Sequence, residues 1–341
     1  MKAFHIGPQT GINSLVRVEV QEPVAGPGQV VVWPTMVSLI NRDAQILKGI
    51  YAGKLPENRI PVSEGVGIIA SVGEGVVDFQ VGDRVIASHF PTWLDGSFSA
   101  SFFTHDVGVT HDGWLAERIL LPAASLIKVP EEFEDKDVAG LSSVALTAWN
   151  ALVQVGRVKA GELVLCLGTG GVSMAALQIA KMNGAKVAIT SSSDEKLDIA
   201  RKLGADITIN YVKQADWADA LHQKTDGRGA DIIIETGGQD TLGRSIEAAA
   251  PNGVIAVIGV TPGANSPIPF YASLILKNVT IRGIANGSRA MFQDLLRAMA
   301  QHKIKTLEAR TFSFDDAPEA YVYFEKAKHI GKVFIQLDGD K

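Results

Sequence analysis

Three features are scarce in this chain, and each scarcity excludes a class of protein. Cys166 is the single cysteine among 341 residues, so neither an intrachain disulfide nor a four-cysteine zinc site can form. The 32 Lys and Arg residues are outnumbered by 37 Asp and Glu residues, which argues against a nucleic-acid partner. Apolar runs stay well short of the roughly 20 residues that cross a bilayer. No basic segment followed by an apolar core begins the chain, so we expect a cytoplasmic protein without a membrane partner.

The composition that remains is that of a packed globular protein. Hydrophobic residues make up 46% of the chain and charged residues 20%, and the length favours about two domains. Residues 1–125 contain short β-like runs, such as Val30–Trp33 and Gly67–Val72, separated by Gly and Pro. This pattern predicts a compact, mainly antiparallel β domain.

Residues 126–287 show a different pattern of apolar and polar residues. Apolar runs such as Leu163–Leu167, Lys186–Thr190 and Asp231–Glu235 alternate with amphipathic stretches of about ten residues. That alternation predicts an α/β fold with a doubly wound parallel sheet. Residues 288–341 read as a helix, a polar connection, a second helix and a final strand, and we expect them to return to the first domain.

A glycine-rich turn follows the first apolar run of this region. Gly168, Thr169, Gly170, Gly171 and Val172 lead from the predicted strand into a predicted helix. A backbone without Cβ atoms approaches a diphosphate closely, and the helix N-terminus offers free N–H groups to it. The third glycine of the usual G-x-G-x-x-G spacing is replaced by a small residue, Ser173. The turn predicts a dinucleotide cradle, and the alternative is a tight turn that holds no ligand.

The end of the second strand indicates which dinucleotide is bound. NAD-binding folds usually carry an acid there, whereas this chain has Ser191, Ser192 and Ser193. An acid about 5 Å from a 2′-phosphate would be repelled by about 3 kcal/mol at an effective dielectric of about 20. Three hydroxyls and the nearby Lys196 suit that phosphate, which predicts NADP(H) as cofactor. The alternative is that the serines cap the helix that begins near Asp194.

Small residues end the next two strands of the predicted sheet. Thr236 and Gly237 follow one strand, and Gly259 and Val260 follow the other. Ligands of such sheets bind at the carboxyl ends of the strands, so these residues would leave room for the nicotinamide end. Ordinary strand-ending turns would use the same residue types.

Several motifs along the chain resemble those of the medium-chain dehydrogenase/reductase superfamily. The resemblance implies a GroES-like, mainly β catalytic domain built from both chain ends, with a Rossmann domain between them. Its nearest branch is similar to the zinc-independent NADPH:quinone oxidoreductases and related alcohol-dehydrogenase-like proteins. The segments that carry it are Glu64–Gly67, Val81–Val85, Gly113–Glu117, Leu146–Leu152, the glycine turn and Gly331–Val333.

The resemblance also implies that no catalytic metal is bound. Zinc-containing members of the family use a Cys, a His and a second Cys, and these positions hold Asn41, Ser63 and Ser143 here. Residues 90–110, where the family places a structural zinc, contain no cysteine. In the quinone-reductase branch a Lys and a Tyr bind the 2′-phosphate, and they fall on Lys196 and Tyr211.

Without a metal, the site suits acceptors that spread incoming negative charge themselves, as quinones and enones do. The resemblance makes Asn41 and Tyr51 the groups that orient the acceptor oxygen and puts Thr147 near the nicotinamide; Tyr51 is alternatively a pocket wall. We therefore expect NADPH-dependent reduction of a quinone, enone or aldehyde by a homodimer. The alternatives are an NAD(P)-dependent alcohol or aldehyde dehydrogenase and an NADPH-binding protein with little turnover.

Other chemically notable residues have ordinary structural explanations. His89, His105 and His111 fit no short metal-binding spacing, so we expect packing or solvated roles. Glu64 is expected to pair with a nearby Arg. Trp93 either lines an apolar cleft or packs within its own loop.

Overall fold

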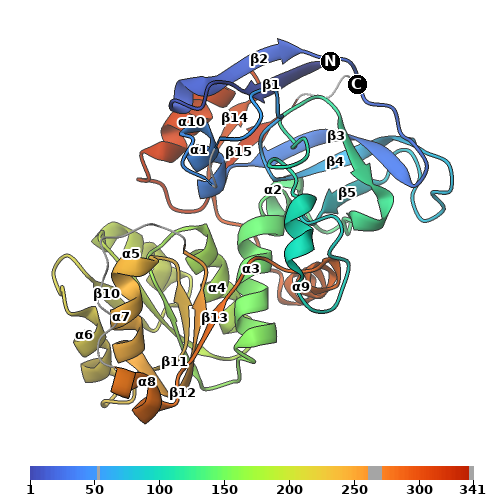
Figure 1. The fold of residues 1–341 in the computed structure, drawn as a ribbon. Coiled ribbons are helices and arrows are strands. Elements are labelled where there is room, and N and C mark those ends of the chain that lie inside the picture. The colour runs from blue at the N-terminus through green and yellow to red at the C-terminus, as the bar shows by residue number, and fades with distance from the viewer. Residues whose placement is uncertain (52–53, 260–270, 338–341) are drawn as a thin grey trace. The chain divides into compact units, whose positions relative to one another are not determined.

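The computed structural model describes residues 1–51, 54–259 and 271–337, and it divides into two compact units (Figure 1). The first unit comprises Met1–Ser143 and Gly287–Lys341, and the second comprises Val144–Asn286. The first unit therefore contains both chain ends. It also continues past residue 125, where the sequence pattern had suggested a boundary, because the strand Leu126–Lys128 pairs with Arg84–Ala87 in its sheet.

A seven-stranded sheet forms the framework of the first unit. Its order is β14-β15-β3-β4-β5-β7; β6 pairs with β3, while β1 and β2 form a separate antiparallel pair. All pairs in the large sheet are antiparallel except β14 with β15. The strands are β1 (Lys2–Ile6), β2 (Leu15–Glu19), β3 (Gln29–Ser38), β4 (Glu64–Val72), β5 (Arg84–Ala87), β6 (Ile119–Pro122), β7 (Leu126–Lys128), β14 (Glu308–Ser313) and β15 (Lys332–Gln336).

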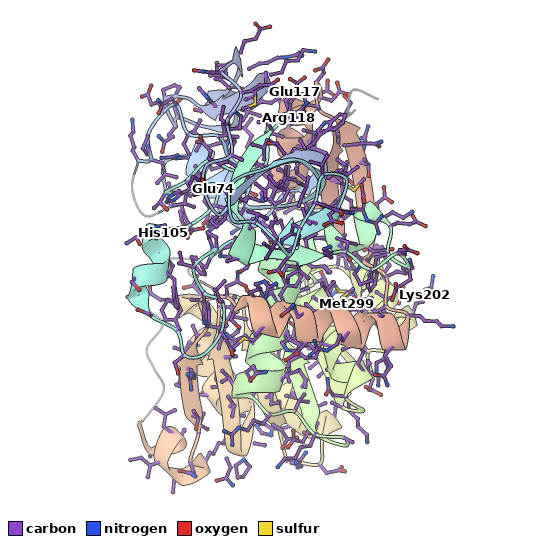
Figure 2. All side chains as sticks on the ribbon, turned by 90° about the vertical axis from the view of Figure 1, so that its right-hand side faces the viewer. Glu74, His105, Glu117, Arg118, Lys202 and Met299 are labelled. Carbon is purple, nitrogen blue, oxygen red and sulfur yellow. The ribbon has the colours of Figure 1, made fainter. Side chains whose placement is uncertain are left out.

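Helices and short turns complete this unit. The α-helices are α1 (Asn41–Leu47), α2 (Asp135–Val138), α9 (Arg289–His302) and α10 (Ala317–Glu325). The core gathers the buried side chains of Phe4, Trp114 and Tyr321. Gly65 is required here, since a Cβ atom would lie 2.9 Å from the Trp114 ring. The guanidinium of Arg118, which Figure 2 labels, lies 4.8 Å from the centroid of the Trp33 ring.

The second unit is built on six parallel strands in the order β10-β9-β8-β11-β12-β13. They are β8 (Leu163–Cys166), β9 (Lys186–Ser191), β10 (Ile207–Asn210), β11 (Ala230–Glu235), β12 (Ala249–Val257) and β13 (Thr280–Gly283). The helices are α3 (Leu146–Trp149), α4 (Gly171–Met182), α5 (Asp194–Lys202), α6 (Trp217–Lys224), α7 (Gln239–Ala248) and α8 (Tyr271–Lys277). The order reverses between β8 and β11, the type of position where doubly wound sheets bind ligands.

The uniformly apolar sequence of β8 explains how this central strand is covered. Leu163, Leu165 and Leu167 belong to one buried cluster together with Trp217 of α6 and Ile246 of α7. Successive strand residues point to opposite faces, so an entirely apolar β8 is covered on both sides. The predicted α/β fold, with a mainly antiparallel β unit that contains both chain ends and a doubly wound parallel sheet between them in sequence, is confirmed.

Two details differ from the sequence expectation. The polar connection after α9 contains a strand, β14, because Glu308–Ser313 alternates exposed and half-buried residues along an edge of the sheet. The apolar run Val279–Ile284 predicts a further strand of the parallel sheet, whereas the observed strand β13 spans only Thr280–Gly283 and is exposed. The continuous helical stretch Asp135–Val155 is long and apolar enough to cross a membrane, and 72% of its most apolar window is buried in the protein. Such burial is typical of a core helix.

Candidate functional site

The glycine turn at the end of β8 forms an open cradle. Gly168 has φ 71°, a left-handed conformation that favours glycine, and its N–H donates to Thr190 Oγ1 at 3.0 Å. Ideal Cβ atoms on Gly168 and Gly170 would meet no other atom within 4 Å, so side chains there would fill open space. Gly170 precedes α4 and caps it with no side chain, so the first N–H groups of the helix remain for a ligand. This cradle fits a diphosphate.

Ser173, which replaces the third glycine of the motif, has a definite role. Its Oγ donates to the carbonyl oxygen of Leu167 at 2.7 Å, and the residue is buried. Thr236 Oγ1 donates to the same carbonyl, also at 2.7 Å. One oxygen thus joins the glycine turn after β8 to the turn after β11.

The serines at the end of β9 have different roles. Ser193 is the N-cap of α5, and its Oγ accepts from the N–H of Lys196 at 3.3 Å. Ser191 is buried, and its Oγ lies 3.3 Å from Thr169 Oγ1 in the glycine turn. Ser192 is exposed. The capping explanation therefore holds for Ser193, while Ser191 and Ser192 lie at the carboxyl end of β9 beside the cradle.

Two further residues gather at this end. The N–H of Tyr211 donates to the Ser191 carbonyl at 3.1 Å, and the Tyr211 side chain is 41% exposed. Lys196 lies in the first turn of α5, and partial burial lowers the pKa of its ammonium group. At the start of the same helix, Asp194 accepts from Lys213 Nζ at 2.5 Å and from Asn210 Nδ2 at 2.7 Å. These bonds lower the pKa of Asp194, whose carboxylate is paired with Lys213.

The turn after β11 is held by a buried carboxylate. Glu235 Oε1 accepts from the N–H groups of Gly237 at 2.8 Å and Gly238 at 3.1 Å. Gly259, at the end of β12, packs so closely that a Cβ atom would lie 2.3 Å from the Thr236 carbonyl oxygen. Thr236, Gly237 and Gly259 therefore lie together at the carboxyl edge, whereas Val260 lies outside the described residues.

Thr147 also belongs to the second unit. It is buried on α3, and its Oγ1 donates to Asn286 Oδ1 at 3.4 Å. Asn150, one helical turn later, donates to the Asn286 carbonyl. The side chains of Thr147 and Asn150 thereby bond Asn286, the residue that ends the second unit.

The other two candidate catalytic residues lie in the first unit. Asn41 is the exposed first residue of α1, and Tyr51 is half-buried just after that helix. The helix begins with a local cap: the N–H of Ile40 donates to Asp43 Oδ2 at 2.9 Å. Asn41 and Tyr51 thus lie in one unit and Thr147 in the other, and the three are not brought together by contacts within either unit.

Arg42, which the sequence had not singled out, organises this part of the first unit. Its Nη1 donates to both carboxylate oxygens of Asp106, at 3.0 and 2.8 Å. Its Nη2 donates to Ser63 Oγ and to the Val107 carbonyl. The guanidinium carbon also lies 5.8 Å from the centroid of the Tyr51 ring. A guanidinium therefore bonds Ser63, the residue that stands where the family's zinc-containing members have histidine.

Two buried carboxyl groups, those of Asp43 and Asp106, interact with the single guanidinium of Arg42. Asp43 is buried, and Ser63 Oγ donates to its Oδ1 at 3.3 Å. Burial raises the pKa of Asp43 to about 7, although Arg42 opposes the rise. Burial likewise raises the pKa of Asp106 to about 6. Two buried carboxyl groups share one Arg, so the cluster holds a proton more readily than isolated aspartates do.

Glu64 pairs with a lysine, not with the arginine expected from the sequence. Lys332 Nζ donates to Glu64 Oε1 at 2.6 Å, and both side chains are buried. The other carboxylate oxygen accepts from the N–H of Ser143 at 2.8 Å. The family's second Cys position, Ser143, therefore serves a structural contact through its backbone.

An aromatic loop and the histidines His89, His105 and His111 also lie in the first unit. Trp93 is buried and stacks on Phe102 with ring centroids 5.5 Å apart, so it packs within its own loop. His105 and His111 are exposed and stacked at 5.1 Å, whereas His89 is buried. Among the described residues, no three His, Cys, Asp or Glu side chains are grouped so that they could hold a metal ion.

Comparison with known proteins identifies the family. Residues 26–131 match the model of the alcohol dehydrogenase GroES-like domain, and residues 171–301 match that of the zinc-binding dehydrogenase. A zinc-type alcohol dehydrogenase-like protein of Schizosaccharomyces pombe is 41% identical over 96% of this chain and 97% of its own length. The chain belongs to the medium-chain dehydrogenase/reductase superfamily. It is therefore an oxidoreductase of a pyridine-nucleotide-binding family, which confirms the resemblance.

Proteins named as reductases, alcohol dehydrogenases and quinone oxidoreductases are similar to it. An acryloyl-coenzyme A reductase of Sulfurisphaera tokodaii is 30% identical over 98% of this chain and all (100%) of its own. Among solved structures, a putative alcohol dehydrogenase of Sinorhizobium meliloti has TM-score 0.88 and 38% identity, with 94% of each chain covered. An NAD-dependent alcohol dehydrogenase has TM-score 0.90 and 30% identity, with 99% of this chain and 100% of that one covered. A quinone oxidoreductase of Pseudomonas syringae has TM-score 0.82 and 27% identity, with 98% and 99% covered.

Proposed function

We propose that this medium-chain dehydrogenase/reductase is an NADPH-dependent reductase of an activated carbonyl or alkene that works without a catalytic metal. The observation that carries the proposal is the combination at the carboxyl edge of the second unit. An open glycine cradle lies beside strand β9, which ends at Ser191 and is followed by Ser192, with Lys196 in the first turn of the next helix and no acid at the strand end. Hydroxyls and an ammonium group suit a 2′-phosphate better than an unmodified ribose.

The proposed absence of a catalytic metal rests on the chemistry of the donors. Asn41, Ser63 and Ser143 offer neither thiolate nor imidazole, the groups that bind zinc best. Arg42 already bonds the Ser63 hydroxyl. Elemental analysis of purified protein is expected to find well below one zinc per chain, and one tightly held zinc per chain would contradict this part of the proposal.

When bound, NADPH supplies the hydride. The chain's own part is to orient the acceptor and to provide a proton, since reduction adds a hydride and a proton together. Tyr51 carries a hydroxyl that can donate to the acceptor oxygen, and its ring lies beside the fixed Arg42 guanidinium. Asn41, exposed at the start of α1, can donate through its side-chain amide.

The substrate class follows from the same chemistry. Without a Lewis acid, hydride transfer is easiest to acceptors that delocalise negative charge, such as quinones and enones. A relative named acryloyl-coenzyme A reductase and a neighbour named quinone oxidoreductase are consistent with such acceptors. Alcohol or aldehyde oxidoreduction is the second candidate, favoured by the similarity to proteins named alcohol dehydrogenase.

The deciding experiment measures binding first and turnover second. Fluorescence titration is expected to show tighter binding of NADPH than of NADH, and equal affinities would remove the cofactor argument. NADPH oxidation is then followed with naphthoquinone, methyl vinyl ketone and benzaldehyde. Faster turnover of the first two supports the proposal, aldehyde preference supports the alternative, and binding without turnover indicates an NADPH-binding protein.

We also infer a cytoplasmic homodimer. Among the described residues β13 is an edge strand, exposed along its four residues, and such an edge is a template for pairing with a second copy. Sedimentation of the purified protein tests this, and a monomer at micromolar concentration would contradict it.

A further inference from the structure

A buried carboxylate lies at the carboxyl edge of the second unit's sheet. Glu235 is 0% exposed and accepts hydrogen bonds from four donors that all follow it in sequence. The donors are the N–H groups of Gly237 and Gly238 and the hydroxyls of Thr241, at 2.6 Å, and Ser245. The turn after β11 and the first two turns of α7 are thereby gathered around one side chain.

Two helices begin at this edge of the sheet, and the surroundings of their N-termini differ. α4 follows β8 with an N-cap glycine, and open space surrounds Gly168 and Gly170. α7 follows the neighbouring strand β11, and the carboxylate of Glu235 lies at its positive end, where it accepts from the N–H groups of Gly237 and of the N-cap residue Gly238. A diphosphate is therefore directed to α4, and the start of α7 shapes the backbone beside it.

The backbone between Glu235 and α7 is closely packed by its neighbours. A Cβ atom on Gly237 would lie 2.4 Å from Thr241 Oγ1. On the other side, a Cβ atom on Gly259 would lie 2.3 Å from the Thr236 carbonyl oxygen. Thr236 Oγ1 in turn donates to the Leu167 carbonyl, just before the glycine turn. Residues 236–238 are therefore held from three sides.

The strand order indicates which half of a dinucleotide this turn faces. A doubly wound sheet binds one mononucleotide half on each side of the point where the strand order reverses. Here β9, with Ser191 at its end, lies on the adenosine side of that point, and β11 and β12 lie on the other side. We propose that Glu235 is a positioning residue for the nicotinamide half of the cofactor, acting through the backbone of residues 236–238. The proposal rests on the proposed function.

The test compares the binding of NADPH with the binding of 2′,5′-ADP, which lacks the nicotinamide half. Glu235→Gln keeps the size of the side chain but replaces one acceptor oxygen with an amide that cannot accept. Calorimetry is expected to show NADPH binding about tenfold more weakly to this variant, with the affinity for 2′,5′-ADP changed less than about twofold. Glu162→Gln is the matched control: its carboxylate accepts from the Lys159 N–H at 2.9 Å, before β8, at the opposite edge of the sheet. It should leave both affinities unchanged.

Equal weakening of both ligands, or no weakening of NADPH, would overturn the proposal. If Glu235→Gln does not fold, Ser245→Ala removes one donor from the same carboxylate, and about threefold weaker binding of NADPH alone is expected. Different results would contradict the proposed function itself. A wild-type protein that prefers NADH contradicts the NADPH assignment, and the comparison is then made with NADH and ADP. Binding of neither dinucleotide would overturn the proposed function and Glu235's role together.

Discussion

Ser173 Oγ and the carbonyl oxygen of Leu167 lie 2.7 Å apart, across the glycine turn that precedes α4. Thr236 Oγ1 donates to the same oxygen at the same distance. A carbonyl has two lone pairs, so both hydroxyls can be accommodated at once. The residue that breaks the glycine spacing thus helps to hold the cradle together with the turn after β11.

This shared acceptor predicts a non-additive pair of substitutions. Ser173→Ala and Thr236→Val should each lower the free energy of unfolding by about 1 kcal/mol, because each leaves the carbonyl with one hydroxyl donor. The double variant removes both donors and should lose about 1 kcal/mol more than the sum. Urea denaturation of the four proteins measures this cycle. Additivity within about 0.3 kcal/mol would show that the carbonyl does not couple the two turns.

A second prediction concerns the charge beside the serines. Lys196→Ala should weaken NADPH binding by about tenfold, because it removes an ammonium group from the proposed 2′-phosphate position, and should change NADH binding little. Lys202→Ala is the matched control, since Lys202 is exposed at the other end of α5 (Figure 2). Fluorescence titration of both variants with both dinucleotides provides the measurement. An identical loss for NADPH and NADH would assign Lys196 to the fold instead.

The sequence revealed the parts of the fold that depend on local pattern. Leu163–Leu167 is uniformly apolar because β8 is covered on both faces, so its place in a parallel sheet could be predicted. The strand β14 could not, because Glu308–Ser313 is polar and pairs with β15, which lies later in the chain. A half-buried edge strand of this kind shows little apolar alternation.

In the candidate site, too, local sequence signals could be predicted and contacts between distant residues could not. Gly168 and Gly170 were predictable because a bare turn between a strand and a helix is a local signal. The bond between Arg42 and Asp106 was not, because 64 residues separate the partners and neither belongs to a recognisable motif. The pairing of Glu64 was predicted with the wrong cation, since its partner Lys332 comes from the far end of the chain.

A third prediction follows from the raised pKa of Asp43. The folded protein holds this proton with a pKa of about 7, whereas an unfolded chain releases it near pH 4, so the folded state binds more protons between these values. The free energy of unfolding should therefore fall as the pH rises from about 4 to about 7. Asp43→Asn keeps an oxygen acceptor for the Ile40 N–H and should reduce this fall by about 2 to 4 kcal/mol.

Urea denaturation between pH 4.5 and 7.5, a range of about three units around these values, measures the effect. Asp315→Asn is the control, since Asp315 is exposed and pairs with Arg17 at the surface. It should leave the pH dependence unchanged. A wild-type protein that gains stability over this range would show that Asp43 is ionised throughout.

The buried pair of Glu64 and Lys332 gives the last prediction. Lys332→Met should destabilise the protein by about 3 to 5 kcal/mol, because it leaves the Glu64 carboxylate buried without its cation. Adding Glu64→Gln should recover much of that loss, since the charge itself is then removed. Lys48→Met, which breaks the half-exposed pair with Glu325, should cost at most about 1 kcal/mol. If Lys332→Met and Lys48→Met cost the same in urea denaturation, water reaches the Glu64 carboxylate, and β15 is not held to β4 by charge.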